Sequence, residues 1–266
     1  MKVITSPDNP CVRRFASLRT HKGREQTGAF LAEGVSLIED ALNSNCRVNT
    51  LFVRSDIVEN KRIKSLLKKA QSEDVKVIIT SERVFKKITS RETPQGVAAE
   101  IAKPMLPPLE KVRTRGLLIM AERLQDPRNA GLLLRTSLAA GVNAVFLTTD
   151  SVDPFHPAAV QTSMGAILHL PVYTKVNPVD LINTIRTIGG KVYAALPGGA
   201  IDMLKWKPPP QPLLLVFGNE SGGVSDGVRK NCDSTISIPI FGKIESLNVS
   251  VAAGILCYRY RTAQIE

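Results

Sequence analysis

The sequence of 266 residues has few aromatic side chains, no paired cysteines and no long apolar run. Phe, Trp and Tyr make up 5% of the chain, too few for an extended platform on which nucleobases stack. The four cysteines are scattered, without a C-x-x-C pair or a neighbouring histidine, which is typical of reduced cytosolic thiols. The N-terminal residues lack the apolar segment of a secretory signal, and nothing approaches the length of a membrane span. We therefore expect a cytoplasmic protein that binds neither metal nor membrane.

Basic side chains outnumber acidic ones, 35 to 24. The net charge is +11. Residues 1–105 hold 19 basic and 12 acidic side chains, an excess of +7, and the remainder holds 16 and 12, an excess of +4. Such a basic excess indicates a polyanionic partner, most simply nucleic acid, although a solubilising surface would give the same number.

Apolar periodicity alternates between strand and helix patterns along the whole chain, so we expect an α/β protein. A proline-containing stretch at 103–116 predicts a linker between a smaller domain, 1–105, and a larger one, 106–266. The strands expected in the first domain are 29–32, 50–54, 75–80 and 96–101, and the helices 35–42, 60–71 and 81–88. The second domain is expected to have strands at 117–121, 144–148, 191–195 and 213–217, and helices at 130–140, 178–188 and 248–260. Because several of these strands are wholly apolar, they favour a mainly parallel sheet covered by helices on both faces.

Three segments of the second domain place turn-forming and small polar residues where an apolar strand ends. They are ERLQDPRNAGLLLRT (122–136), LLLVFGNESGGVS (213–225) and ISIPIFGKIESLNVSVAAG (236–254). The carboxyl edge of an open α/β sheet is where ligands bind. Three such segments in one half of the chain predict a composite site.

The first segment reads as a helix entry with Asn129 as its N-cap. Arg135 follows among leucines, a setting that would ordinarily exclude an unpaired charge, so we expect a buried or interfacial arginine that meets an anion. The second segment, 218–223, is glycine-rich but is neither a P-loop nor a G-x-G-x-x-G dinucleotide fingerprint, which excludes a nucleotide-dependent oxidoreductase. In the third, a strand ends near Ile238 and polar residues cap a helix of small residues, Asn248 among them.

In order and residue type, the three segments resemble the three motifs of the SpoU/TrmH family of RNA ribose 2′-O-methyltransferases, within the SPOUT superfamily. The resemblance implies five catalytic residues: Asn129, Arg135, Glu220, Ser246 and Asn248. It implies that S-adenosylmethionine is held by Leu196, Gly218, Asn219, Ile238, Ile240, Ser246 and Leu247. Segments of the first half, such as 22–24, 28–30 and 93–96, are similar to the family's substrate-binding domain. There we expect RNA contacts from Arg13, Arg14, Lys22 and Arg24, with Arg128 adding one from the second domain.

The resemblance also implies features that periodicity cannot reveal. The catalytic domain is expected to form a trefoil knot, which general topology rules would argue against. The first domain is expected to be similar to kink-turn-binding ribosomal proteins. The expected assembly is a homodimer with its active site at or near the subunit interface.

The expected reaction is transfer of a methyl group from S-adenosylmethionine to a ribose 2′-hydroxyl of RNA, with ribosomal RNA favoured. Family proposals make the arginine at position 135 a general base, but a guanidinium with a pKa above about 12 is a poor base at neutral pH. Holding the phosphate beside the target ribose and stabilising a developing alkoxide suits arginine better. The alternative function is a non-catalytic RNA-binding or ribosome-assembly factor on the same scaffold. The presence of all five motif residues argues against it.

Overall fold

The computed structural model describes residues 3–108, 116–210 and 212–264, so part of the proline-rich stretch lies outside the described residues. The chain divides into two compact units. The first consists of residues 1–105 with 155–168, and the second of residues 106–154 with 169–266. The segment 155–168 therefore packs with the first unit, although it lies beyond the break at residue 105 that the sequence indicates.

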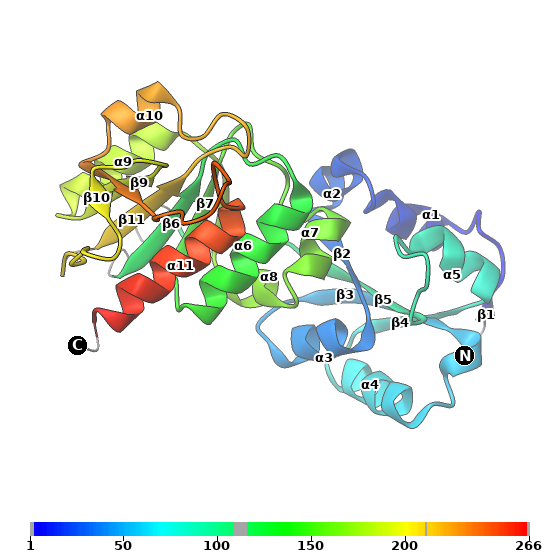
Figure 1. Ribbon diagram of the computed structural model, residues 1–266. Coiled ribbons are helices and arrows are strands. Elements are labelled where there is room, and N and C mark those ends of the chain that lie inside the picture. The colour runs from blue at the N-terminus through cyan, green and yellow to red at the C-terminus, as the bar shows by residue number, and fades with distance from the viewer. Residues whose placement is uncertain (1–2, 109–115, 211, 265–266) are drawn as a thin grey trace. The chain divides into compact units, whose positions relative to one another are not determined.

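The first unit is built on a mixed five-stranded sheet in the order β1-β4-β3-β5-β2 (Figure 1). Strand β5 pairs antiparallel with β2 and β3, and the other pairs are parallel. Its strands are β1 (Val3–Ile4), β2 (Ala29–Glu33), β3 (Val48–Arg54), β4 (Lys76–Thr80) and β5 (Val97–Ala102). Its helices are α1 (Pro10–Ser17), α2 (His21–Thr27), α3 (Val35–Asn43), the 3-10 turn η1 (Ser55–Ile57), α4 (Lys61–Ser72), α5 (Glu82–Ile88) and α7 (Pro157–Thr162). The short helix α8 (Ala166–His169) ends at the boundary between the units.

Helices cover both faces of this sheet. Residues of α1 and α5, such as Phe15 and Phe85, form one core with Phe52 of β3, and the rings of Phe15 and Phe52 lie 4.2 Å apart. Helices α3 and α4 pack against each other and contact strands β2, β4 and β5. Helix α7 packs on β2, and Phe155 just before it contacts Phe30, with 5.0 Å between ring centroids. These apolar contacts are why segment 155–168 belongs to the first unit.

The second unit contains a seven-stranded sheet in the order β10-β12-β9-β11-β6-β7-β8, and every strand pair is parallel. The strands are β6 (Leu117–Ala121), β7 (Ala144–Thr148), β8 (Val172–Val176), β9 (Lys191–Ala195), β10 (Ile201–Asp202), β11 (Leu213–Phe217) and β12 (Ser234–Ser237). The helices are α6 (Pro127–Ala139), α9 (Pro178–Thr187), α10 (Asp226–Lys230) and α11 (Val249–Thr262). The predicted α/β fold with a mainly parallel sheet is confirmed.

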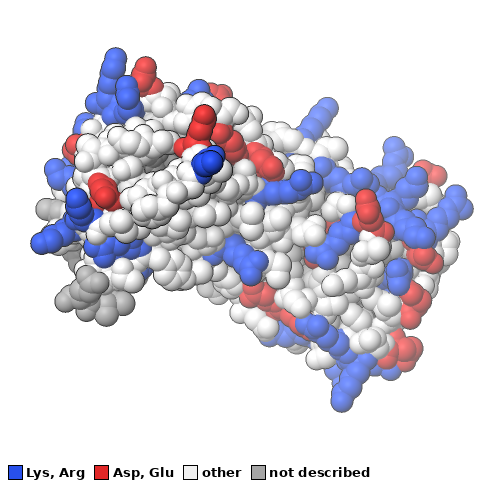
Figure 2. All heavy atoms as spheres, in the orientation of Figure 1, with Lys and Arg blue, Asp and Glu red and all other residues white. Residues whose placement is uncertain are grey.

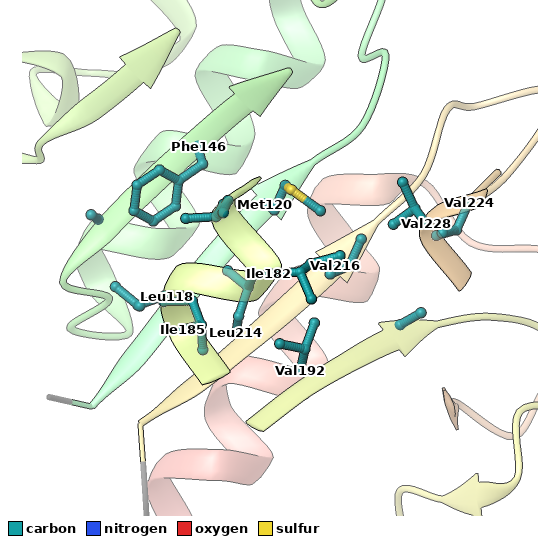
Figure 3. Packing of buried hydrophobic residues seen from close by; sticks show 13 residues of the cluster. Leu118, Met120, Phe146, Ile182, Ile185, Val192, Leu214, Val216, Val224 and Val228 are labelled. Atoms are coloured by element: carbon teal, nitrogen blue, oxygen red, sulfur yellow. The ribbon is translucent and has the colours of Figure 1, made fainter. Parts of the chain in front are cut away.

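The central strands are buried on both faces, as their apolar sequences predict. All five residues of β6, β7 and β11 are buried. Figure 3 shows Ile182 and Ile185 of α9 lying over Leu118, Leu214 and Val192. Helices α6 and α11 pack against each other and lie together in Figure 1. The rigid centre of the sheet thus fixes where the loops at its carboxyl edge begin.

Candidate active site

The first two motif segments leave neighbouring strands at the same edge of the sheet. Strands β6 and β11 pair in register, with Ala121 opposite Phe217, so both strands end side by side. The backbone amide of Glu122 then donates to the carbonyl oxygen of Phe217 at 2.8 Å. Because the strand order turns back at these two strands, their loops lie at the switch point of an open α/β sheet, a position where ligands bind.

The glycine-rich segment after β11 is a tight loop closed by its own backbone. Asn219 and Gly223 exchange two backbone hydrogen bonds, of 3.0 and 2.9 Å. The Asn219 side-chain oxygen accepts from the amides of Ser221 and Gly222 at 2.8 and 3.1 Å. A Cβ atom at Gly218 would lie 1.9 Å from the carbonyl carbon of Gly223, so only glycine fits at that position. The glycines therefore serve loop closure.

Two charged residues that the sequence did not single out hold this loop in place. The buried carboxylate of Glu122 accepts from the Ser225 amide at 2.8 Å. Arg123 has a left-handed backbone (φ 54°), and its carbonyl oxygen accepts from the Asn219 side-chain amide at 2.7 Å. The signal for both was a pair of charged residues directly after a wholly apolar strand.

A chain of side-chain hydrogen bonds joins the three motifs. Asn248 Nδ2 donates to Asn129 Oδ1 at 2.9 Å, and Asn129 Nδ2 donates to Glu220 Oε1 at 2.9 Å. Residues 119 positions apart in sequence thus meet directly. Three of the five predicted catalytic residues lie together in one network.

The helix caps are partly as predicted. Asn248 is the N-cap of α11, and its side chain accepts from the Ser250 amide. The prediction that Asn129 caps α6 is wrong, because the helix starts earlier in the chain. Asp126 is its N-cap, with Pro127 in the first turn, where the fixed φ of proline favours helix initiation. The shift leaves the Asn129 side chain available for the network.

A cavity of about 590 Å³ lies next to this network, in the size range of ligand pockets. Its walls come from the ends of β9, β11 and β12 and from the segment before α11. Among its lining residues are all seven expected to hold a cofactor, which are Leu196, Gly218, Asn219, Ile238, Ile240, Ser246 and Leu247. Glu220 and Asn248 line it as well. Strand β12 ends at Ser237, so Ile238 and Ile240 present an irregular backbone to the cavity.

Arg135 lies elsewhere on α6 and is exposed. Of the two settings expected for it, burial within the chain is therefore wrong, and an interfacial position stays a prediction. It does not line the cavity, and it has no hydrogen bond or ion pair to the residues that the structure describes. Its neighbours on the helix surface include Leu132 and Leu138, both more than a third exposed. Arg128, also exposed, lies seven residues before it, two turns back along the same helix face.

The basic residues expected to bind RNA fall into two groups. Arg13, Arg14 and Lys22 are exposed, and Figure 2 shows basic side chains gathered where α1, α2 and α5 lie. Arg14 also pairs with the buried carboxylate of Glu100 at 2.7 Å. The prediction for Arg24 is wrong, because its side chain is 1% exposed and donates to the Leu18 carbonyl oxygen at 2.9 Å. Arg24 thus stabilises the turn between α1 and α2.

The pKa values of two cysteine thiols are raised, one on the buried Cys257 and one on the half-buried Cys232. Burial raises the pKa of Cys257 to about 12, and burial together with Asp233 raises the pKa of Cys232 to about 11. Neither thiol is therefore a nucleophile at neutral pH. Among the described residues, no three His, Cys, Asp or Glu side chains are grouped to hold a metal ion. Nor does any described helix have the length and apolar character needed to span a membrane.

The parallel sheet and the three-motif site define an α/β methyltransferase of the SpoU type. Residues 116–258 match the SpoU rRNA Methylase family, and residues 9–99 match the MRM3-like substrate binding domain. The chain belongs to the SpoU family.

Individual relatives are similar over almost the whole chain. The chain is 34% identical to the 23S rRNA (guanosine(2553)-2′-O)-methyltransferase RlmP of Bacillus subtilis, covering 98% of this chain and 100% of that protein. An AdoMet-bound rRNA methyltransferase from Sinorhizobium meliloti matches with a TM-score of 0.88 and 28% identity, over 98% and 97% of the two chains. The SpoU methyltransferase AviRb from Streptomyces viridochromogenes in complex with AdoMet matches with a TM-score of 0.87 and 26% identity, over 97% and 98%.

Proposed function

We propose that this chain transfers a methyl group from S-adenosylmethionine to a ribose 2′-hydroxyl of RNA, with ribosomal RNA as its substrate. The observation that carries the proposal is the cavity beside the Asn129–Glu220–Asn248 network, formed by the three motifs of the family. RlmP, whose length the chain spans completely, is named for 2′-O-methylation of 23S rRNA, and AviRb has been solved with AdoMet. We place the activity in the cytoplasm, where such a substrate lies.

The residues around the cavity suit an adenosine derivative. Ile238, Ile240 and Leu196 offer apolar surface for the adenine ring, while the irregular backbone at Gly218 and Leu247 offers amide and carbonyl groups. The bound cofactor supplies a methyl group on a sulfonium, whose departure leaves a neutral thioether. The protein has only to position the acceptor hydroxyl in line and to make it more nucleophilic.

Arg135 is proposed to hold the phosphate beside the target ribose and to stabilise the developing alkoxide. Its guanidinium is exposed and free of protein partners among the described residues, so it is available for an anion. Ser246, which is exposed at the cavity, is proposed to contact the nucleotide. Arg128 is proposed to bind a neighbouring phosphate from the same helix face.

The first unit is proposed to select the RNA, as a domain similar to kink-turn-binding ribosomal proteins. Its larger basic excess and its match to a substrate-binding family model support this role. Arg13, Arg14 and Lys22 are the proposed phosphate contacts.

The second unit is proposed to carry a trefoil knot and to dimerise through α6 and α11. The exposed apolar side chains of these helices, Leu132, Leu138, Val251 and Tyr258, support the dimer. Arg135 lies among them, so dimerisation would bring it next to a second chain. The active site is therefore proposed to be completed at the subunit interface.

The test is to map 2′-O-methylated positions in total RNA with and without the gene. Loss of one ribosomal site is expected, with restoration by the purified protein and S-adenosylmethionine in vitro. Calorimetry with EDTA present should show undiminished cofactor binding, since no metal site is proposed. RNA binding without any lost methylation would favour the alternative, a non-catalytic assembly factor.

A further inference from the structure

The orientation of one side-chain amide in the site is fixed by the start of α11. Asn248 Oδ1 accepts two hydrogen bonds from Ser250, one from its backbone amide at 2.9 Å and one from its hydroxyl at 2.6 Å. An NH₂ group has no lone pair to offer an N–H donor, so the oxygen of Asn248 has to face the helix. Its Nδ2 has to face away from the helix, toward Asn129.

The orientation of the Asn248 amide fixes the orientation of the Asn129 amide. Because Asn248 presents a donor, Asn129 has to meet it with its oxygen, as the 2.9 Å contact shows. Asn129 Nδ2 is thereby turned to Glu220, to which it donates at 2.9 Å. Reversing either amide would set like groups against each other at both of its ends. The hydrogen bonds therefore run in one direction only, from Ser250 to Glu220.

Glu220 is the last member of this chain of hydrogen bonds, and both of its carboxylate oxygens accept. Oε1 accepts from Asn129, and Oε2 lies 3.4 Å from the backbone amide of Gln125, which also points its N–H at the carboxylate. The Glu220 side chain, which lines the cavity, thus accepts on both oxygens and is held in one orientation from the far end of the network.

We propose that Ser250 is a positioning residue for the methyl-transfer site, because it fixes the direction of a hydrogen-bond chain that runs through Asn248 and Asn129 to Glu220. Ser250 is 6% exposed and does not line the cavity, so it acts through Asn248. The inference rests on the proposed function only in the identity of the ligand, S-adenosylmethionine.

The first experiment reverses one link. In Asn129→Asp the donor to Glu220 is replaced by a carboxylate oxygen, and two carboxylates then face each other. The affinity for S-adenosylmethionine, measured by calorimetry, is expected to fall at least about tenfold at pH 8. The loss should shrink toward pH 5.5, because like charge raises the pKa of one carboxyl and a shared proton replaces the missing donor. Wild type should show no such pH dependence.

The double variant Asn129→Asp with Glu220→Gln restores the match with its direction reversed. The new carboxylate at position 129 would still accept from Asn248, and the amide now at position 220 would donate to it, while the oxygen of that amide accepts from Gln125. Cofactor affinity is expected to recover to within about threefold of wild type, without the pH dependence. A double variant no better than Asn129→Asp, or a single variant that binds like wild type at pH 8, would overturn the proposal.

Ser250 is tested by removing its hydroxyl. Ser250→Ala keeps the backbone amide that donates to Asn248 but loses the hydroxyl donor, so the Asn248 amide is held in its orientation less firmly and cofactor affinity is expected to fall about fivefold. Ser250→Thr restores the hydroxyl and should recover most of that affinity, whereas a purely structural role would change only the urea midpoint. Wild-type protein is run in parallel. Failure of wild type to bind or methylate contradicts the proposed function, while an active wild type with equally active Ser250→Ala contradicts the inference alone.

Discussion

Gly254 of α11 faces Thr136 of α6 so closely that a Cβ atom built on Gly254 would lie 3.1 Å from Thr136 Cγ2. The absence of a side chain at Gly254 lets the two helices approach at this point. Asn129 lies on the first of these helices and Asn248 caps the second. The spacing at Gly254 therefore helps to set the distance across which the two asparagines bond.

Enlarging position 254 is expected to destabilise the second unit. Gly254→Leu should lower the free energy of unfolding by about 1–3 kcal/mol, because a larger side chain forces the helices apart. Gly254→Ala should be nearly neutral, since the gain in helix propensity, about 1 kcal/mol, offsets the tight contact. Adding Thr136→Ser removes the opposing methyl group and should make the alanine variant more stable. Urea denaturation of the three variants gives the order of their free energies of unfolding. If Thr136→Ser does not change the stability of the alanine variant, the contact between positions 254 and 136 does not destabilise it.

Arg135→Ala is expected to reduce methyl transfer at least about a hundredfold while cofactor affinity stays within about twofold. Cofactor affinity should change little because Arg135 is exposed on α6 and does not line the cavity. Methyl transfer should fall because the proposed contact with the phosphate and the developing alkoxide is lost. Arg135→Lys should also be poor, because a point charge cannot reproduce the planar fork of a guanidinium. Single-turnover methylation and calorimetry separate the two effects, and near-normal turnover in either variant would remove the assignment.

Charge reversal at Arg13 and Lys22 is expected to weaken RNA binding about tenfold and to make its salt dependence shallower, because phosphate contacts are lost. Arg24 provides the matched contrast, since it is buried and bonded to Leu18. Arg24→Met should cost about 2 kcal/mol of stability and leave the salt dependence of binding unchanged. Filter binding at several salt concentrations and urea denaturation check both results. Equal salt slopes for all variants would contradict the proposed RNA face.

The stability of the protein is expected to fall at alkaline pH through Cys232 and Cys257. Burial holds their pKa values at about 11 and about 12 in the folded chain, above the value of about 8.5 for an unfolded thiol. Their contribution is therefore complete below about pH 8.5 and is lost as the pH rises toward 11 and 12, because only the unfolded chain ionises in that window. Urea denaturation at pH 7.5, 9 and 10.5 should show a shallower pH slope when both residues are alanine. An unchanged slope would contradict the assignment.

The sequence predicts best the elements whose environment is uniform. Strands 117–121, 144–148 and 213–217 match β6, β7 and β11 residue for residue, because burial on both faces requires apolar side chains throughout. The N-cap at Asn248 could also be predicted, because capping depends only on the side chain of that residue and the backbone of the next two. Family resemblance, and not periodicity, supplied the residues around the cavity.

Other features depend on contacts that a linear pattern does not contain. Residues 21–27 carry no apolar side chain and residues 10–17 are too short for a clear helical period, so α1 and α2 were not expected, and Arg24 looked like a surface residue. Nothing in residues 155–168 shows that Phe155 packs on Phe30 in the first unit. A chain beginning near residue 110 would expose this surface, so point variants test the first unit more cleanly than truncation.

The assignment of residues 155–168 to the first unit has a consequence for synthesis on the ribosome. A nascent chain that has reached residue 105 still lacks Phe155 and α7, so its first unit cannot close before much of the second has been made. The second unit in turn waits for the start of α11, the last helix among the described residues, where Asn248 lies. Domains usually fold in succession as they emerge. Here the first unit is completed only after part of the second has been made, and until then the apolar surface of Phe30 that Phe155 covers stays unpaired and open to chaperones and proteases.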